Sequence, residues 1–127
     1  MKIIDELKYT KDHEWISVKE SSRSGIIGIT DFAQEELGDV VFVELPNIDD
    51  SYSRNDVFGT IEAVKTVADL YVPISGKIVE INEELESNPE LINSDPYGKG
   101  WIAKIELEDL SDLDKLLNSK EYESLIK

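Results

Sequence analysis

The chain has 127 residues, and 28 Asp and Glu residues outnumber 13 Lys and Arg residues, which gives a net charge of −15. This length fits one domain, and a hydrophobic fraction of 40% favours a folded chain despite the charge. The acidic balance argues against a surface that neutralises nucleic-acid phosphates or docks on an anionic membrane. The absence of cysteine excludes disulfides, thiol nucleophiles and cysteine-based metal sites.

The N-terminal residues have neither the apolar stretch of a signal peptide nor the Arg-rich character of a transit peptide. No apolar run approaches the roughly 20 residues that a membrane span needs. We therefore expect a cytoplasmic protein that forms a single domain over residues 1–127.

The first half of the chain is typical of short strands joined by turns. β-branched runs predict strands over residues 14–19, 25–30 and 40–45. Between the second and third of these, a short helix is expected, with Asp31 as its cap and Gly38 in the left-handed conformation at its end. A period of two predicts two faces for the third strand, with Val41, Val43 and Leu45 on one and Val40, Phe42 and Glu44 on the other.

The second half continues this pattern and then changes period. Strands are predicted over residues 56–64, 66–72, 77–82 and 101–107. Asn88 and Pro89 predict the start of a helical turn. One helical face is predicted by the spacing of Leu110, Leu113, Leu116 and Leu117, and a final helix by a capping box of Asn118 and Glu121. We expect a mainly β domain with a helical C-terminal appendage over about residues 109–127.

Residues 61–70 form a near palindrome about the Lys65–Thr66 bond. In a hairpin with a two-residue loop, its mirrored residues become the cross-strand pairs Val64–Val67, Ala63–Ala68, Glu62–Asp69 and Ile61–Leu70. Lys-Thr lacks the Gly or Asn that such loops usually need, and the mirrored acids would repel each other. Lys65 is nevertheless expected at an exposed tip, where its amine can be acylated, although a merely solvated lysine is the plainer interpretation.

The segment 59–76 resembles the lipoyl-bearing region of the glycine cleavage system H protein family. Glu62, Val64 and Lys65 match the family's Glu-Ser-Val-Lys-Ala motif, whereas Ala63 replaces its Ser and Thr66 replaces its Ala. Three further blocks are similar to family motifs in the same order, and they cover residues 9–15, 33–46 and 93–101.

The resemblance implies a lipoyl/biotinyl-type flattened barrel, or barrel-sandwich hybrid, of two antiparallel sheets with short helices. It implies a non-catalytic carrier that bears lipoate as an amide on Lys65, N6-lipoyllysine. Such a carrier moves the aminomethyl group of glycine from the PLP-dependent glycine decarboxylase (P protein) to the tetrahydrofolate-dependent aminomethyltransferase (T protein). Dihydrolipoamide dehydrogenase (L protein) reoxidises it, and lipoylating enzymes modify it.

Other functions remain open at this point. The first is a lipoyl-relay or regulatory carrier that is acylated on Lys65 but does not serve glycine cleavage. The second is an acidic β domain that binds a protein and carries no modification. A biotin carrier is disfavoured, because that family's lysine usually lies between methionines and the sole methionine here is Met1.

The remaining candidate residues favour structural roles. His13 is the sole histidine, and we expect it to be structural because it has no evident catalytic partners. Trp15 and Trp101 are expected in the core, and no metal site is expected. The loop 95–100 either supports the hairpin or is simple turn chemistry. Acids such as Glu35, Glu36 and Asp39 are expected to steer encounters with partners.

Overall fold

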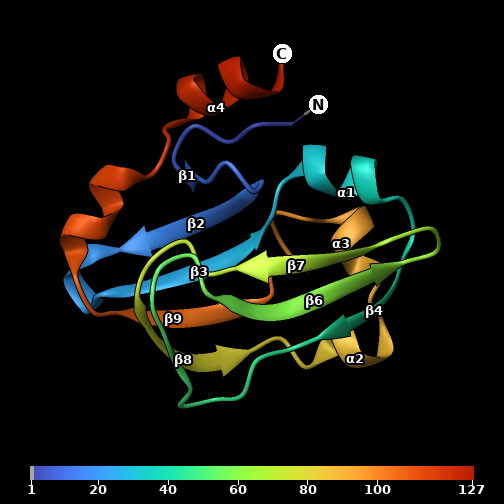
Figure 1. Cartoon of the computed structure of the whole chain (residues 1–127), viewed down its shortest axis with the longest axis horizontal. Coiled ribbons are helices and arrows are strands. Elements are labelled where there is room, and N and C mark those ends of the chain that lie inside the picture. Colours follow the sequence, from blue (N-terminus) through green and yellow to red (C-terminus); the bar gives the residue numbers. More distant parts are fainter. Residues whose placement is uncertain (1) are drawn as a thin grey trace.

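The structure is a computed structural model that describes residues 2–127, and its strands form two antiparallel sheets (Figure 1). The larger sheet has the order β1 (Lys8–Tyr9), β2 (Glu14–Lys19), β3 (Ser24–Ile29), β9 (Ala103–Leu107), β8 (Gly76–Ile81) and β5 (Ser51–Tyr52). The smaller sheet has the order β4 (Val40–Glu44), β6 (Val57–Ala63) and β7 (Val67–Tyr71). This arrangement confirms the predicted mainly β class of two antiparallel sheets.

Short helices lie around the sheets and at the C-terminal end. They are the α-helices α1 (Asp31–Leu37), α2 (Glu84–Ser87), α3 (Leu91–Ser94) and α4 (Ser119–Ile126), and the 3-10 helices η1 (Glu20–Ser22) and η2 (Leu110–Lys115). Within residues 2–127, no helix is long and apolar enough to cross a membrane.

Two hydrophobic clusters hold the fold together. The main core contains fully buried side chains from both sheets, among them Ile27, Ile61, Ile78 and Ile105. They occupy alternate strand positions, so each strand turns one apolar face inward. A second cluster joins the N-terminal strands to α4 through Leu7, Tyr9, Trp15 and Tyr122, with Trp101 packed against it and only partly buried.

Strand β4 differs from the predicted alternation. Its pairing with β6 shifts register between Val40 and Phe42, which is a β-bulge. A bulge places an extra residue in one strand, and this interrupts the alternation of inward and outward side chains at that point. Val40 and Val43 are therefore both buried, while Val41 and Phe42 are both exposed. The predicted face of Val41, Val43 and Leu45 is wrong for this reason.

Two of the predicted helix caps are wrong, although α1 begins at Asp31. Thr30, not Asp31, caps α1, and its hydroxyl accepts the Ala33 N–H at 3.2 Å. The Asp31 carboxylate instead accepts hydrogen bonds from Lys2 N and the Gln34 side chain. Asn88 is likewise not a side-chain cap, because α3 begins later, after Glu90.

The end of α1 and the C-terminal appendage follow the predictions only in part. Gly38 has the expected positive φ of 79°, but its ψ of −158° is extended and not left-handed helical. The predicted leucine-rich helix is a 3-10 helix, η2, and it ends before Leu116. The capping box of α4 is confirmed, since Asn118 and Glu121 exchange both hydrogen bonds.

Candidate functional site

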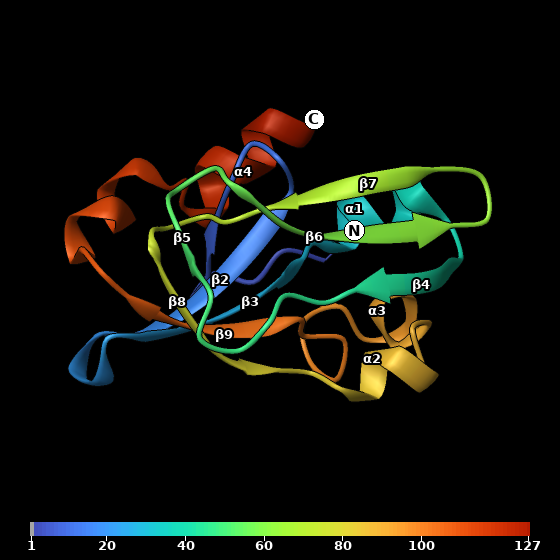
Figure 2. The same cartoon turned by 60° about the horizontal axis from the view of Figure 1, so that its bottom comes forward.

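Strands β6 and β7 form a long hairpin that projects beyond the rest of the molecule (Figure 2). Its register differs from the palindromic pairing, because Glu62 faces Val67 and Thr60 faces Asp69. All four predicted pairs are therefore wrong: Val67 faces Glu62 and not Val64, Ala68 faces Ile61 and not Ala63, and the Glu62–Asp69 and Ile61–Leu70 pairs do not form. The observed register separates the two acids, so the like-charge repulsion expected from the palindrome does not arise.

The tip of the hairpin is centred one residue earlier than predicted. Ala63 N donates to Thr66 O at 2.8 Å, which leaves Val64 and Lys65 as the two tip residues. Among residues 2–127, positive φ angles occur at other residues and at neither tip residue. A type I′ turn needs positive φ at both central positions, so this turn is of a different type and tolerates a lysine.

The segment that joins α1 to β4 supports the tip from one side. Val64 N donates to Asp39 O at 3.0 Å, and Val40 pairs with Ala63. Asn93 of α3 holds this segment, because its side chain accepts from Val40 N at 2.9 Å and donates to Gly38 O at 2.8 Å. The tip is thus fixed to the body of the protein close to the position of Lys65.

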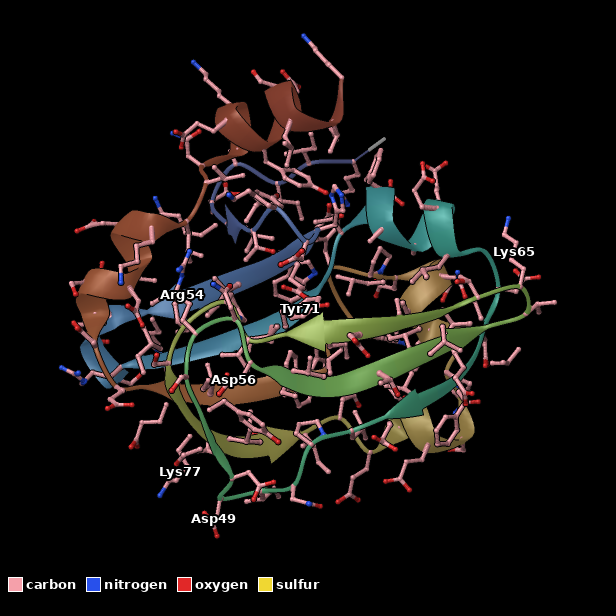
Figure 3. All side chains as sticks on the ribbon, viewed as in Figure 1. Asp49, Arg54, Asp56, Lys65, Tyr71 and Lys77 are labelled. Carbon is pink, nitrogen blue, oxygen red and sulfur yellow. The ribbon has the colours of Figure 1, made fainter. Side chains whose placement is uncertain are left out.

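The Lys65 side chain leaves the tip and points into solvent (Figure 3). Among residues 2–127, no acceptor forms a hydrogen bond or an ion pair with its ammonium group. A Cβ added to Gly38 would lie 3.4 Å from Lys65 Cε, an ordinary contact distance, so Gly38 lies directly beside the lysine stem. An exposed, unpaired primary amine on a supported hairpin tip is chemically suited to acylation.

A small cavity of about 170 Å³ lies alongside the hairpin, next to α1 and β2. Its floor is apolar and includes Ile29, Ile61 and Leu70. The carboxyl groups on its lining belong to Asp12, Glu14, Glu36 and Asp69. This combination of an apolar floor and acidic walls can shelter a cationic group from solvent.

Glu14 is the buried acid of that lining, with 1% of its surface exposed. Tyr71 N donates to its Oε2 at 2.8 Å, and Thr10 Oγ1 lies 3.1 Å from Oε1. Burial outweighs these contacts and raises the pKa of Glu14 to about 8. The carboxyl therefore bridges the two sheets and is mostly protonated at neutral pH.

His13 has structural contacts, as the sequence indicates. Its Nδ1 lies 2.9 Å from the Tyr122 hydroxyl, and its ring packs against Phe32. Tyr122 also hydrogen-bonds Thr30, so this group joins α4 to the start of α1. Burial lowers the pKa of His13, which favours a neutral ring.

The loop 95–100 is organised by its own turn contacts. Asp95 accepts the Lys99 N–H through its side chain and the Gly98 and Gly100 N–H groups through its backbone. Support for the hairpin comes instead from Asn93, which lies at the start of the same sequence block. Asn93 was not among the predicted site residues, and no local pattern distinguishes it from other polar residues.

Comparisons with known proteins agree with this geometry. The family model described as glycine cleavage H-protein matches residues 7–127. Curated proteins named glycine cleavage system H protein are similar over nearly their full length. The one from Symbiobacterium thermophilum is 57% identical over 96% of this chain and 94% of its own. The one from Staphylococcus haemolyticus is 53% identical over 99% of this chain and 98% of its own.

A solved structure shows the same fold. The crystal structure of a glycine cleavage system H protein from Mycobacterium marinum has a TM-score of 0.89 and is 38% identical in sequence. The similarity covers 96% of this chain and 97% of that one. It agrees with the barrel-sandwich arrangement that the resemblance implied.

Proposed function

The chain belongs to the glycine cleavage H-protein family and is a carrier component of the glycine cleavage system, and we propose that Lys65 is the residue through which it carries its cargo. Family membership favours glycine cleavage over the lipoyl-relay alternative. The observation that supports the assignment to Lys65 is its position, as an exposed and unpaired amine at a supported hairpin tip.

The residues around Lys65 fit an amide-linked lipoyl group. The amine is free of partners among residues 2–127, and Gly38, which lies beside the lysine stem, has no side chain. A bound lipoyl group would supply a redox-active dithiolane, which this cysteine-free chain does not contain. The protein would then contribute attachment and orientation, and we propose that it is not itself catalytic.

The cavity beside the hairpin gives the chain a second role in this proposal, which is to protect the cargo. Lys65 is three residues from Ala68, which lines the cavity, or roughly 10 Å along a strand. The acidic lining, with Asp12 and Asp69 at the surface, complements a positively charged amino group. We propose that these residues shelter the aminomethyl cargo from water during transfer.

An exposed tip is accessible to several enzymes in turn, as a carrier requires. We propose that Lys65 is presented in turn to lipoylating enzymes, glycine decarboxylase, the aminomethyltransferase and dihydrolipoamide dehydrogenase. Exposed apolar side chains near the tip, Val64 at 75% and Val67 at 61%, provide contact area for such transient partners. The single domain over residues 1–127 and the cytoplasmic location stay predictions.

Intact-mass analysis after expression in a lipoylation-competent host tests the attachment site. We expect the unsubstituted chain to gain one lipoyl increment and the Lys65→Ala and Lys65→Arg variants to gain none. Lys77→Ala is the matched control, because Lys77 is an exposed lysine on β8, away from the tip, and its variant should still be modified. Lipoylation of either Lys65 variant would refute the assignment. A lipoylated chain that supports no glycine decarboxylase turnover would refute the carrier function separately.

A further inference from the structure

A second cavity, of about 440 Å³, lies at the opposite end of the hairpin from Lys65. Three separate segments line it: the end of β1 and the turn after it (residues 9–12), the turn before β6 (residues 54–55), and the end of η2 with the two residues that follow it (residues 115–117). Arg54 lies before β6 and Lys65 after it, so this strand of 7 residues separates them. At ~3.3 Å per residue the separation is on the order of 20 Å. Figure 3 shows Arg54 and Lys65 at opposite ends of the molecule.

This cavity has a positive lining in a strongly acidic protein. Lys11, Arg54 and Lys115 all line it, although the whole chain has only 13 Lys and Arg residues. The opposing charges are Asp12 on the same lining and Asp112, whose Oδ1 lies 3.3 Å from Lys115 Nζ. Lys11 and Arg54 form no ion pair within residues 2–127. The local excess of charge is therefore positive.

Arg54 has an unmet hydrogen-bonding requirement in this cavity. Its backbone N–H donates to Ser75 Oγ at 2.9 Å, which fixes the residue in its turn. Its side-chain Nε is buried, and no atom of residues 2–127 accepts a hydrogen bond from it. A buried N–H without an acceptor costs free energy, so a small rotation that presents the Nε–Nη edge to an acceptor would be favourable. That edge matches the paired oxygens of a phosphate or a carboxylate.

We propose that this cavity binds the phosphate group of a small phosphomonoester, with Arg54 as the principal ligand and Lys11 and Lys115 as further cationic ligands. Because Asp112 pairs with Lys115, the two cations without an ion pair, Lys11 and Arg54, match the double charge of a phosphate, whereas a carboxylate carries one charge only. The volume exceeds that of a lone phosphate and falls in the range of small-molecule sites. The apolar floor of Tyr9, Leu116 and Leu117 would contact the body of the ester.

The net charge of the chain does not prevent this binding. At physiological ionic strength the Debye length is ~8 Å, so distant carboxylates are largely screened while the lining cations act at contact distance. The site is separate from Lys65, so the inference is independent of the proposed carrier function.

Titration of the isotope-labelled full-length chain, followed by NMR, tests the inference. The probes are glycerol phosphate, inorganic phosphate and acetate, each compared with sodium chloride at equal ionic strength near neutral pH. We expect saturable shifts at the amides of Lys11, Asn55 and Leu116, with glycerol phosphate binding most tightly and acetate most weakly. Equal shifts with acetate and phosphate, or shifts that sodium chloride reproduces, would overturn the proposal.

Substitution of Arg54 provides a second test of the proposed phosphate site. Arg54→Gln should weaken glycerol phosphate binding by ~10-fold or more, as expected for the loss of charged hydrogen bonds. Lys77→Gln makes the same charge change at an exposed site elsewhere and should leave the dissociation constant unchanged. Unaltered affinity in Arg54→Gln, in a variant whose spectrum shows the native fold, would contradict the assignment. Lipoylation of Lys65 should be normal in both variants.

Discussion

Glu14 shows how burial changes the state of a single residue. The side chain lies between the two sheets with 1% of its surface exposed, and its pKa rises from 4.5 to about 8. In the unfolded chain the same carboxyl ionises near its ordinary pKa. Between those two values the folded state therefore holds a proton that the unfolded state has lost.

This difference predicts how stability depends on pH. Because the folded state binds more protons, the free energy of unfolding should decrease as pH rises from about 4.5 to about 8. One proton contributes a slope of up to ~1.4 kcal/mol per pH unit. Glu14→Gln removes the titrating group and keeps the hydrogen-bonding shape, so its stability should vary less with pH.

Urea unfolding at several pH values measures this effect. Glu44→Gln is the matched control, because Glu44 is an exposed strand glutamate and its variant should keep the pH dependence of the unsubstituted chain. An identical slope in Glu14→Gln and the unsubstituted chain would show that Glu14 is ionised in the folded state.

At the scale of elements, the hairpin that carries Lys65 depends on a neighbouring connection. The segment between α1 and β4 supports the tip through Asp39, and Asn93 of α3 holds that segment. The Asn93 side chain makes three hydrogen bonds, to Val40 N, Gly38 O and Gln34 Oε1. One amide thus joins α3 to α1 and to β4, both of which are distant from it in sequence.

Removal of this amide should loosen the tip without unfolding the protein. Asn93→Ala leaves polar backbone groups without partners, so we expect a loss of ~1–3 kcal/mol in the free energy of unfolding. Amide hydrogen exchange at Val40 and Val64 should become faster than in the unsubstituted chain. Asn88→Ala is the control, because Asn88 is exposed and its side chain is not a helix cap. Unchanged exchange at both amides would contradict the supporting role of Asn93.

On the scale of the whole molecule, the net charge of −15 is distributed unevenly. Glu35, Glu36 and Asp39 are exposed close to the tip, whereas a positive cavity lies at the other end of the hairpin. Acidic groups close to Lys65 can accelerate encounters with basic partner surfaces, and such long-range attraction weakens with salt.

Neutralisation of the acids near the tip tests this steering. The combined Glu35→Gln, Glu36→Gln and Asp39→Asn variant should slow turnover with at least one partner enzyme at low salt, and the difference should shrink at high salt. The control combines Glu106→Gln, Glu108→Gln and Asp114→Asn, which removes the same charge from exposed positions around β9 and η2. Equal rates for the two variants with every partner enzyme would exclude steering by these three acids.

Local sequence signals determined much of this protein. The β-branched runs predict the main strands, the Asn118–Glu121 pattern predicts the cap of α4, and the palindromic segment predicts Lys65 at an exposed tip. These features depend on residues close together in the chain, so periodicity and propensity are enough to find them. The motifs around Lys65 likewise lie in one continuous segment.

Tertiary structure decided the features that depend on distant partners. The bulge in β4 and the shifted turn follow from pairing between strands, which a single strand does not encode. The proton on Glu14, the hold of Asn93 on the tip and the positive cavity around Arg54 each need groups that are far apart in sequence. Burial and convergence of loops arise only when the chain has folded, and for that reason the sequence by itself could not predict them.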